Sequence, residues 1–485
     1  MEKHLSKIPH WAVSLIPFLV LVVTLVLVIK GFGADALSGG SQVTLMFAAG
    51  VTVAISMLFY KVSWEEFEDS IVNNIKSVAT AVIILLLIGA VAGSWMVSGV
   101  VPSLIYYGMK IIAPSIFLFA TCLICALISI MTGSSWTTIA TIGVALVGIG
   151  TAHGYDAGWT AGAIISGAYF GDKISPLSDT TVLASSSSQT PLFTHIRYMM
   201  ITTVPSFVIS IVVFLVVSLM HETPGQGMTE VFSDNLSSTF NISPWLLLVP
   251  VITGVLISRK VPAIITLFVG ALMAGVFALI FQPHIIYEVA SGTSLQGGSM
   301  SFIEGFKGVF QSYYGSTAID TGNAELNDLI ATRGMNGMLS TIFLVISAAV
   351  FGGTLVGSGM LQSLTAALVK LVRNRVAMVA STVGTGIFAN MITGDQYLSI
   401  ILTSNLYKKL YQERGYESRL LSRSVEDSAT VVSVLIPWNS CGMTQATVLK
   451  VSTLHYLPYC LFNLISPLMS IFIAAIGYKI VKKSK

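Results

Sequence analysis

Charged and hydroxyl side chains interrupt an apolar region in the first half of the chain. The interruption contains two carboxylates, one ammonium and three hydroxyls, at Asp172, Lys173, Ser178, Asp179, Thr180 and Thr181. Hard cations such as Na⁺ prefer carboxylate, hydroxyl and carbonyl oxygens as ligands. Leaving a carboxylate unpaired in hydrocarbon costs about 2.5–3.5 kcal/mol even on the lenient insertion scale. We therefore expect an ion- or proton-binding site here, with Na⁺ held at Asp179.

Similar interruptions occur in the second half of the chain. The ion- or proton-binding candidates there are Thr393, Asp395, Glu426 and Asp427. Further polar positions are candidates for the substrate path, at Thr132, Ser134, Ser135, Lys173, Asn390, Asn439 and Ser440. Asp395 is the second expected Na⁺ ligand, because it lies inside a Thr-Gly interruption of an apolar run.

Each acidic group also has a structural interpretation. Asp172 beside Lys173 is typical of an ion pair at a helix end, and Glu426–Asp427 is typical of a helix N-terminus. Asp179 is harder to explain in this way, because the surrounding sequence is apolar. Both interpretations remain open for Asp172 and Glu426.

Competition between ions is the chemistry that such carboxylates support. Desolvation raises the pKa of a carboxylate from about 4 toward neutrality. One carboxylate then binds either H⁺ or Na⁺, which is sufficient for antiport. Lys173 adds two alternatives: its charge acts on the neighbouring Asp172, or the ammonium is itself displaced by Na⁺.

The composition is that of a membrane protein. Of the 485 residues, 54% are hydrophobic and 10% are charged, against about 25% charged residues in soluble domains. We expect an all-α polytopic membrane protein of roughly 10–13 transmembrane segments, with broken helices or re-entrant hairpins. The net charge of +3 gives no indication of nucleic-acid binding. No nucleotide-binding loop or catalytic constellation is present in the sequence, so neither an ATP-driven pump nor an enzyme is expected.

The chain also shows an internal repeat. Met131–Trp136 resembles Ile392–Tyr397, and the two threonines are 261 residues apart. A second polar patch follows in each half, and we match Asp179–Val182 with Asp427–Val431. Two interrupted hydrophobic segments in each half are typical of secondary transporters, whose substrate site lies where the broken helices meet.

The expected organisation alternates scaffold and core segments. Residues 1–110 form N-terminal scaffold helices, 111–200 the first repeat core, 201–281 scaffold helices, 282–336 a polar external insertion, 337–375 a scaffold helix and cytoplasmic edge, and 376–485 the second repeat core with the last span. Within the first segment, apolar positions at helical spacing over 64–78 predict a short interfacial helix before a span over 79–100.

Basic residues predict the orientation. The segment His221–Ser243 has no Lys or Arg and is expected outside. The positions expected inside are Arg259, Lys260, Lys370, Arg373, Arg375, Lys408, Lys409, Arg414, Arg419, Arg423, Lys482, Lys483 and Lys485. Both termini are accordingly expected in the cytoplasm.

Gly167–Thr181 resembles the signature of the NhaC family of bacterial Na⁺/H⁺ antiporters, and the Thr132–Ser134, Thr393–Asp395 and Glu426–Ser428 segments are similar too. The resemblance extends over most of the chain. It implies a multi-pass protein of the bacterial inner membrane that exchanges Na⁺ and H⁺ within the lipid bilayer and needs no cofactor. Homodimers are common among such transporters, but the residues do not demonstrate one.

Two other functions remain open. Some relatives of the family exchange malate and lactate, and wider relatives carry amino acids. The helix N-termini near Ser134, Ser135, Asn439 and Ser440 are suited to a carboxylate. A cavity large enough for an organic molecule distinguishes this alternative. A channel or membrane enzyme is disfavoured, because the acidic groups lie in repeat-related breaks rather than in a ring or a catalytic pair.

Overall fold

The described residues are almost entirely helical. The computed structural model describes residues 8–32, 39–221, 227–259, 261–293, 300–369 and 372–480. Within these ranges nine helices are long and apolar enough to cross a membrane, and two helix pairs bent by 94° and 56° raise the number to eleven. The prediction of an all-α polytopic membrane protein is confirmed. Lys260, Lys370, Lys482, Lys483 and Lys485 lie outside the described residues.

The first half contains the scaffold helices and the first interrupted segments. Its elements are α1 (Trp11–Ser14), α2 (Ile16–Phe32), α3 (Gly40–Tyr60), α4 (Trp64–Val97), α5 (Val100–Ile111), η2 (Pro114–Ile116), α6 (Phe117–Thr132), α7 (Ser135–Thr138), η3 (Ile139–Gly143), α8 (Val144–Ala152), α9 (Ala157–Ile174), α10 (Asp179–Ser187), α11 (Leu192–Met220), α12 (Gly227–Thr239), η4 (Pro244–Leu247), α13 (Leu248–Ser258) and α14 (Ala263–Phe281).

The second half begins with short helices and ends with the second interrupted segments. Its elements are α15 (Pro283–Ser291), α16 (Phe302–Tyr314), α17 (Ala324–Ile330), α18 (Gly334–Gly337), α19 (Leu339–Gly357), α20 (Met360–Val369), α21 (Arg375–Thr393), α22 (Gln396–Glu413), α23 (Ser418–Val425), η5 (Glu426–Thr430), η6 (Ser433–Leu435), α24 (Ser440–Leu449), α25 (Thr453–Tyr456), η7 (Leu457–Tyr459) and α26 (Leu461–Ile476). The segments η3 and η5 are π-helices.

Helix α4 corrects one expectation. A short interfacial helix before a separate span is wrong, because residues 64–97 form one helix of 34 residues. Ser63 and Glu66 form a reciprocal capping box that starts it. No Gly or Pro follows until Gly89, so nothing in the sequence breaks the helix between its amphipathic start and its apolar part.

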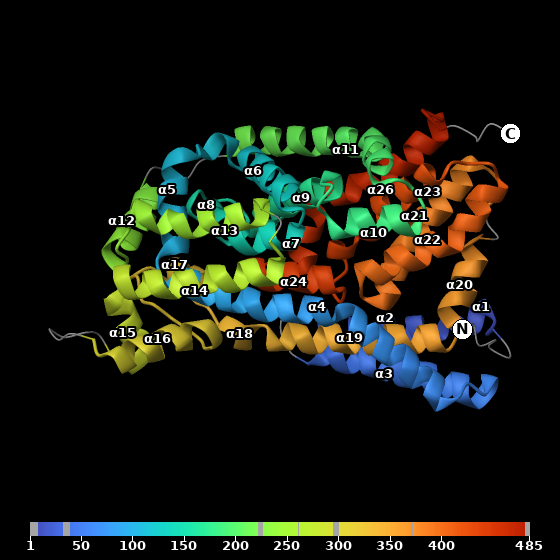
Figure 1. Ribbon diagram of the computed structural model, residues 1–485, viewed down its shortest axis with the longest axis horizontal. Coiled ribbons are helices and arrows are strands. Elements are labelled where there is room, and N and C mark those ends of the chain that lie inside the picture. Colours follow the sequence, from blue (N-terminus) through green and yellow to red (C-terminus); the bar gives the residue numbers. More distant parts are fainter. Residues whose placement is uncertain are drawn as a thin grey trace.

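The segment 282–336 contains four short helices among its described residues, α15 to α18, and α16 and α18 pack against α4. This contact is close, because a side chain at Gly93 of α4 would collide with the carbonyl of Ser312 in α16. The short helices lie at one end of the molecule, beside α12 (Figure 1). That position is opposite to α20–α23 (Figure 1), and the external location of the segment stays a prediction.

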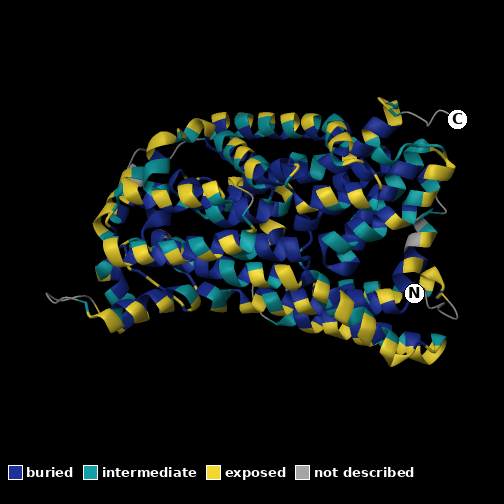
Figure 2. Cartoon of the chain, viewed as in Figure 1, coloured by how far each residue is buried: buried dark blue, intermediate teal, exposed yellow. Residues whose placement is uncertain are grey.

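Helices α7, α9 and α24 are almost wholly buried, and the outer helices carry most of the exposed residues (Figure 2). Helix α1 and the end of α26 lie at the same end of the molecule as α20–α23 (Figure 1). Arg375 at the start of α21 donates a hydrogen bond to the carbonyl of Ala474 in α26 (2.8 Å). The two described chain ends and the most basic connection therefore share one side.

Both Thr-Gly interruptions have the same backbone geometry. Gly133 ends α6 and Gly394 ends α21, with φ angles of 65° and 64°. The next residues, Ser134 and Asp395, are extended and cap α7 and α22 through their side chains. Glycine is suited to these positions because residues with a Cβ rarely adopt positive φ.

The offset of 261 residues continues to the second interruption. The turn Ser175–Ser178 ends α9 and the turn Ile436–Asn439 ends η6; both contain Pro at the second position. In each turn the fourth N–H donates to the first carbonyl, at 3.2 and 3.0 Å. Asp179 therefore corresponds to Ser440, and the expected match of Asp179–Val182 with Asp427–Val431 is wrong.

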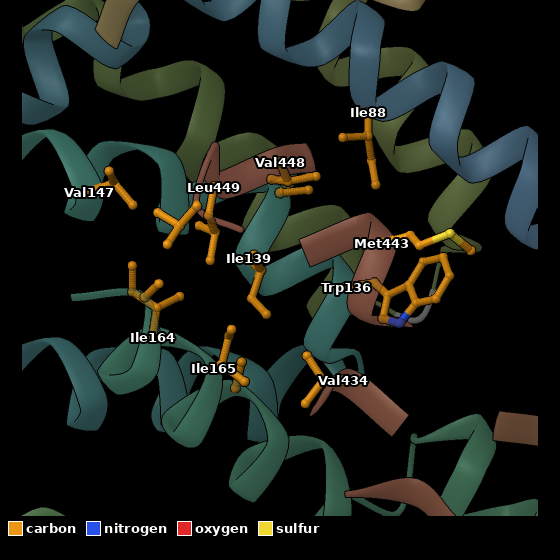
Figure 3. Packing of buried hydrophobic residues seen from close by; sticks show 14 of the residues in the cluster. Ile88, Trp136, Ile139, Val147, Ile164, Ile165, Val434, Met443, Val448 and Leu449 are labelled. Atoms are coloured by element: carbon orange, nitrogen blue, oxygen red, sulfur yellow. The ribbon is translucent and has the colours of Figure 1, made fainter. Parts of the chain in front are cut away.

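Side-chain contacts recur at the same offset. Ser129 Oγ donates to the Ala168 carbonyl and Asn390 Nδ2 donates to the Ala429 carbonyl, both at 2.6 Å. The two halves are thus structural repeats. Helix α10 of the first packs on α22 of the second, and α24 of the second packs on η3 and α8 of the first. Figure 3 shows Ile139 of η3 beside Leu449 of α24. In Figure 1, α22 extends toward α20 and α23, whereas α8 extends toward α5 and α12, so the repeats are inverted.

Replacing Gly394 with Ala is expected to lower thermal stability. A Cβ here would lie 2.7 Å from Cβ of Ala348, and the φ angle of 64° adds strain of about 1 kcal/mol. Gly384 is a matched control, because it lies in the same helix with no atom within 4 Å of an added Cβ. Thermal unfolding in detergent should show a lower midpoint for Gly394→Ala alone. Equal midpoints would contradict the strained geometry.

Candidate functional site

A cavity of about 760 Å³ lies at the interruptions of the first repeat. Its walls come from α4, α6, α7, α9, α10, α22 and the connection between α13 and α14. The predicted site residues that line it are Thr132, Ser134, Asp172, Asp179 and Thr180. The described lining contains two carboxylates and no Lys, Arg or His. A cavity with this charge attracts cations.

Asp172 closes the buried side of the cavity. Its carboxylate accepts hydrogen bonds from the backbone N–H (3.2 Å) and the hydroxyl (2.7 Å) of Ser135. Ser135 is the first residue of α7, so the carboxylate lies at a helix N-terminus, where negative charge is favoured. The equivalent pair in the second repeat is neutral, with the Ser433 hydroxyl donating to Gln396 (3.3 Å).

Asp179 differs from Asp172 in being exposed to the cavity. It is the first residue of α10, and its carboxylate has no hydrogen-bond or ion-pair partner among the described residues. The neighbouring Thr180 side chain bonds with the Ser178 hydroxyl (3.0 Å). An unpartnered carboxylate that faces a cavity is free to bind a cation.

Two of the predicted hydroxyl ligands have structural roles. Ser178 caps α10 by accepting a hydrogen bond from the N–H of Thr181 (3.3 Å). The Thr181 hydroxyl donates to the carbonyl of Lys173 (3.0 Å) and joins α10 to α9. These two residues fix the turn between Asp172 and Asp179 and do not line the cavity.

The interruptions of the second repeat form a separate and closed group. Asp395 is buried, accepts the N–H of Leu398 (2.9 Å), and lies 3.5 Å from the Ser440 hydroxyl. Asn439 donates to the side chain of Asn390 (3.1 Å). None of Asp395, Ser440, Asn439 and Asn390 lines the cavity. Thr393 is also buried, with its hydroxyl donating to the carbonyl of Asp395 (3.0 Å).

Comparisons with known proteins agree with this architecture. A family model described as "Na+/H+ antiporter family" matches residues 2–188 and 167–478. The chain belongs to the Na⁺/H⁺ antiporter family. The Na(+)/H(+) antiporter NhaC of Bacillus subtilis is 35% identical and is covered over 91% of its length by 88% of this chain. NhaC of Alkalihalophilus pseudofirmus is 36% identical, with 88% of each chain covered.

A further relative is named for a different activity. The malate-2H(+)/Na(+)-lactate antiporter of Bacillus subtilis is 36% identical over 82% of this chain and 81% of its own. The expected resemblance to the NhaC family is confirmed by these matches. Members of the Na⁺/H⁺ antiporter family are transporters, so the expectation that the chain is not an enzyme is confirmed as well.

In this member of the Na⁺/H⁺ antiporter family, a third group of predicted residues lies away from the cavity. Lys173 and Asp427 form a buried ion pair, and neither side chain is exposed. The interpretation of Asp172 and Lys173 as an ion pair at a helix end is wrong, because the ammonium of Lys173 pairs with Asp427. Glu426 lies next to this pair and is also fully buried.

Several residues of this antiporter-family site were not predicted. Gln396 and Tyr397 line the cavity from α22 of the other repeat. Ser77 and Thr80 line it from α4, and their spacing of three residues on one helix face is a signal that the sequence contained. Arg423 was predicted only as a basic loop residue, yet it is fully buried and lies 3.9 Å from Asp427.

Proposed function

We propose that this chain is a secondary active transporter that exchanges Na⁺ for H⁺ across the bacterial inner membrane. The observation that carries the proposal is the cavity that exposes Asp179 above the buried Asp172, with hydroxyls around both. Carboxylates and hydroxyls suit a hard monovalent cation. Membership of the Na⁺/H⁺ antiporter family supports it, as do two relatives named as Na⁺/H⁺ antiporters.

The roles of the carboxylates follow from their positions. Asp179 and Asp172 bind the cation on the open side, and protons compete with it at these oxygens. Asp395 supplies the corresponding charge in the closed second repeat. The repeats exchange these roles, because the pair Ser134 and Asp179 is replaced at the equivalent positions by Asp395 and Ser440. Rocking one repeat against the other would open the second group and close the first.

The orientation belongs to the same proposal. Both termini lie in the cytoplasm, on the side of the basic residues of α22 and α23. The cavity opens next to the connection between α13 and α14, which carries Arg259. Outer helices such as α2, α3 and α11 expose large apolar side chains that suit contact with lipid.

A second candidate is the exchange of a small organic acid or amino acid together with Na⁺ or H⁺. The cavity volume favours it, because 760 Å³ lies in the range of small-molecule sites, about 300–1,000 Å³. The charge of the lining disfavours organic anions, since no basic side chain of the described lining would balance a carboxylate. The ammonium group of an amino acid could still pair with the two carboxylates of the cavity, Asp172 and Asp179.

Proton flux in reconstituted vesicles tests the proposal. A pH dye is trapped inside, a Na⁺ gradient is imposed and no organic solute is added. The proposed function gives Na⁺-dependent proton movement. Silence in Na⁺ alone, with flux restored by malate, lactate or an amino acid, would replace it with the second candidate.

A further inference from the structure

Four ionisable side chains form a buried cluster outside the cavity. They are Lys173, Arg423, Glu426 and Asp427, and none has exposed surface. Asp427 also accepts hydrogen bonds from Thr202 of α11 (3.0 Å) and Ser466 of α26 (3.3 Å). The cluster therefore joins η5 and α23 to α9, α11 and α26. Its link to the cavity is along α9, where Asp172, the residue before Lys173, lines the cavity.

Glu426 is the exceptional member of the cluster. Neither of its carboxylate oxygens has a hydrogen bond of normal geometry among the described residues, and the Thr430 hydroxyl is the one neighbouring donor that interacts with the carboxylate. The three guanidinium nitrogens of Arg423 also have no such hydrogen bond among these residues, although its Nε lies 3.9 Å from Asp427. An isolated ionised carboxylate is very unfavourable in a low-dielectric interior, and such a group binds a proton instead. The geometry therefore fits Glu426 in its protonated form.

The repeat indicates that the fold does not need these charges. The positions 261 residues away from Arg423, Glu426 and Asp427 are Gly162, Ile165 and Ser166, and the position equivalent to Lys173 is Val434. The corresponding helix of the first repeat, α9, thus has neutral residues at three of these positions, and its backbone there is α-helical where residues 426–430 are π-helical. Burying two acids and two bases costs several kcal/mol per ion before pairing. A role beyond packing is needed to explain them.

The backbone at Glu426 is also unusual. Residues 426–430 form a π-helical turn, a rare conformation found mostly at functional sites. The turn packs against α10 and α22, which both border the cavity. The cluster therefore does not line the cavity itself, but its π-helical turn packs against two helices that do.

We propose that Glu426 binds a proton that is exchanged during transport, at a site distinct from the cation cavity. The proposal rests on the proposed Na⁺/H⁺ exchange and adds a second titrating position to it. The proton passes between a carboxylate oxygen of Glu426 and water when the site becomes accessible. Loss of the proton leaves a negative charge that interacts with Lys173, in competition with Asp427.

This competition connects the two sites. Lys173 follows Asp172 on α9, so a change of partner for Lys173 acts on the helix that holds the cavity carboxylate. The ionisable groups that neighbouring elements bring to this region are Asp172 and Lys173 of α9, Asp179 of α10, His195 and Tyr198 of α11, Tyr407 and Tyr411 of α22, Arg423 of α23 and Asp427 of η5. The two cations in this list, Lys173 and Arg423, favour release of the proton from Glu426 once Na⁺ has entered the cavity.

Binding of Na⁺ as a function of pH tests the proposal. In purified protein, the slope of log affinity against pH gives the number of protons released per Na⁺ bound. We expect this slope to fall by about one in Glu426→Gln, because the amide cannot release a proton. Na⁺ binding itself should remain, whereas Asp179→Asn should lose it at every pH. Glu304→Gln, a change in an exposed helix cap on α16, should keep the wild-type slope.

Each outcome decides a different question. A wild-type protein without pH-dependent Na⁺ binding would contradict the proposed exchange itself. A wild-type slope in Glu426→Gln would overturn the separate proton site and leave the exchange intact. If Glu426→Gln does not accumulate, Glu426→Asp replaces it, because this change keeps the carboxylate on a shorter side chain. A displaced profile of Na⁺ affinity against pH in Glu426→Asp supports the proposal. An unchanged profile in Glu426→Asp would overturn it.

Discussion

Replacing Asp179 with Asn is expected to abolish Na⁺-driven proton flux while the protein still folds and inserts. The carboxylate faces the cavity without a partner, so the fold loses little when its charge is removed. A bound cation loses a charged ligand, which costs about 2–5 kcal/mol, or roughly thirtyfold or more in affinity. Flux into dye-loaded vesicles, normalised to the amount of inserted protein, measures the effect.

Ser186→Ala is the matched control for this variant. Ser186 lies on the same helix, is exposed, does not line the cavity and donates only to the carbonyl of Leu183 (3.0 Å). It should transport as the wild type does. Near-normal flux in Asp179→Asn would remove this residue from the cation site and leave Asp172 as the remaining carboxylate of the cavity.

The second large effect is expected on stability. Replacing Lys173 with Met leaves the buried Asp427 with only its longer ion pair to Arg423 (3.9 Å), whereas Asp427→Asn leaves the buried Lys173 without an ion-pair partner among the described residues. Breaking a buried pair by removing one partner costs about 3–5 kcal/mol. The double variant should cost clearly less than the sum of the two, because it removes both charges of the Lys173–Asp427 pair and leaves neither of them unpaired. The comparison is made from the thermal unfolding midpoints, in detergent, of the wild type, the two single variants and the double variant.

An exposed ion pair provides the control. Lys409 and Glu413 lie 3.8 Å apart, with 87% and 62% of their side chains exposed. Lys409→Met should leave the unfolding midpoint unchanged, since exposed pairs contribute little. Additive costs for the Lys173 and Asp427 variants would contradict the pairing that the structure shows.

Backbone interruptions were the most predictable part of the site. A Thr-Gly pair inside an apolar run gives a helix end that glycine alone accommodates easily, and both predicted interruptions occur at Gly133 and Gly394. The acidic residues did not predict which positions of the two repeats correspond at the second interruption. Both repeats contain the turn and its proline, at Pro176 and Pro437, whereas the acidic residues occupy different positions in the two repeats.

Partners across the chain were the least predictable part. Asp172 and Lys173 are adjacent in sequence, but successive side chains of an α-helix point about 100° apart. One therefore reaches the cavity and the other reaches Asp427, which is 254 residues away. The extended ion-binding shell expected from the sequence divides for this reason into three groups, at the cavity, at Asp395 and at Glu426.

The shared side of the two described chain ends limits how the chain can thread the bilayer. A chain that starts and finishes on one side must complete an even number of full passages. The nine long helices and the two bent pairs together give an odd number within the described residues. Helices that are shorter or less apolar than those counted therefore decide the number of passages. Two of them have 18 residues: α9, which is almost wholly buried, and α22, which corresponds at the offset of 261 residues to the counted segment Ser135–Ala152.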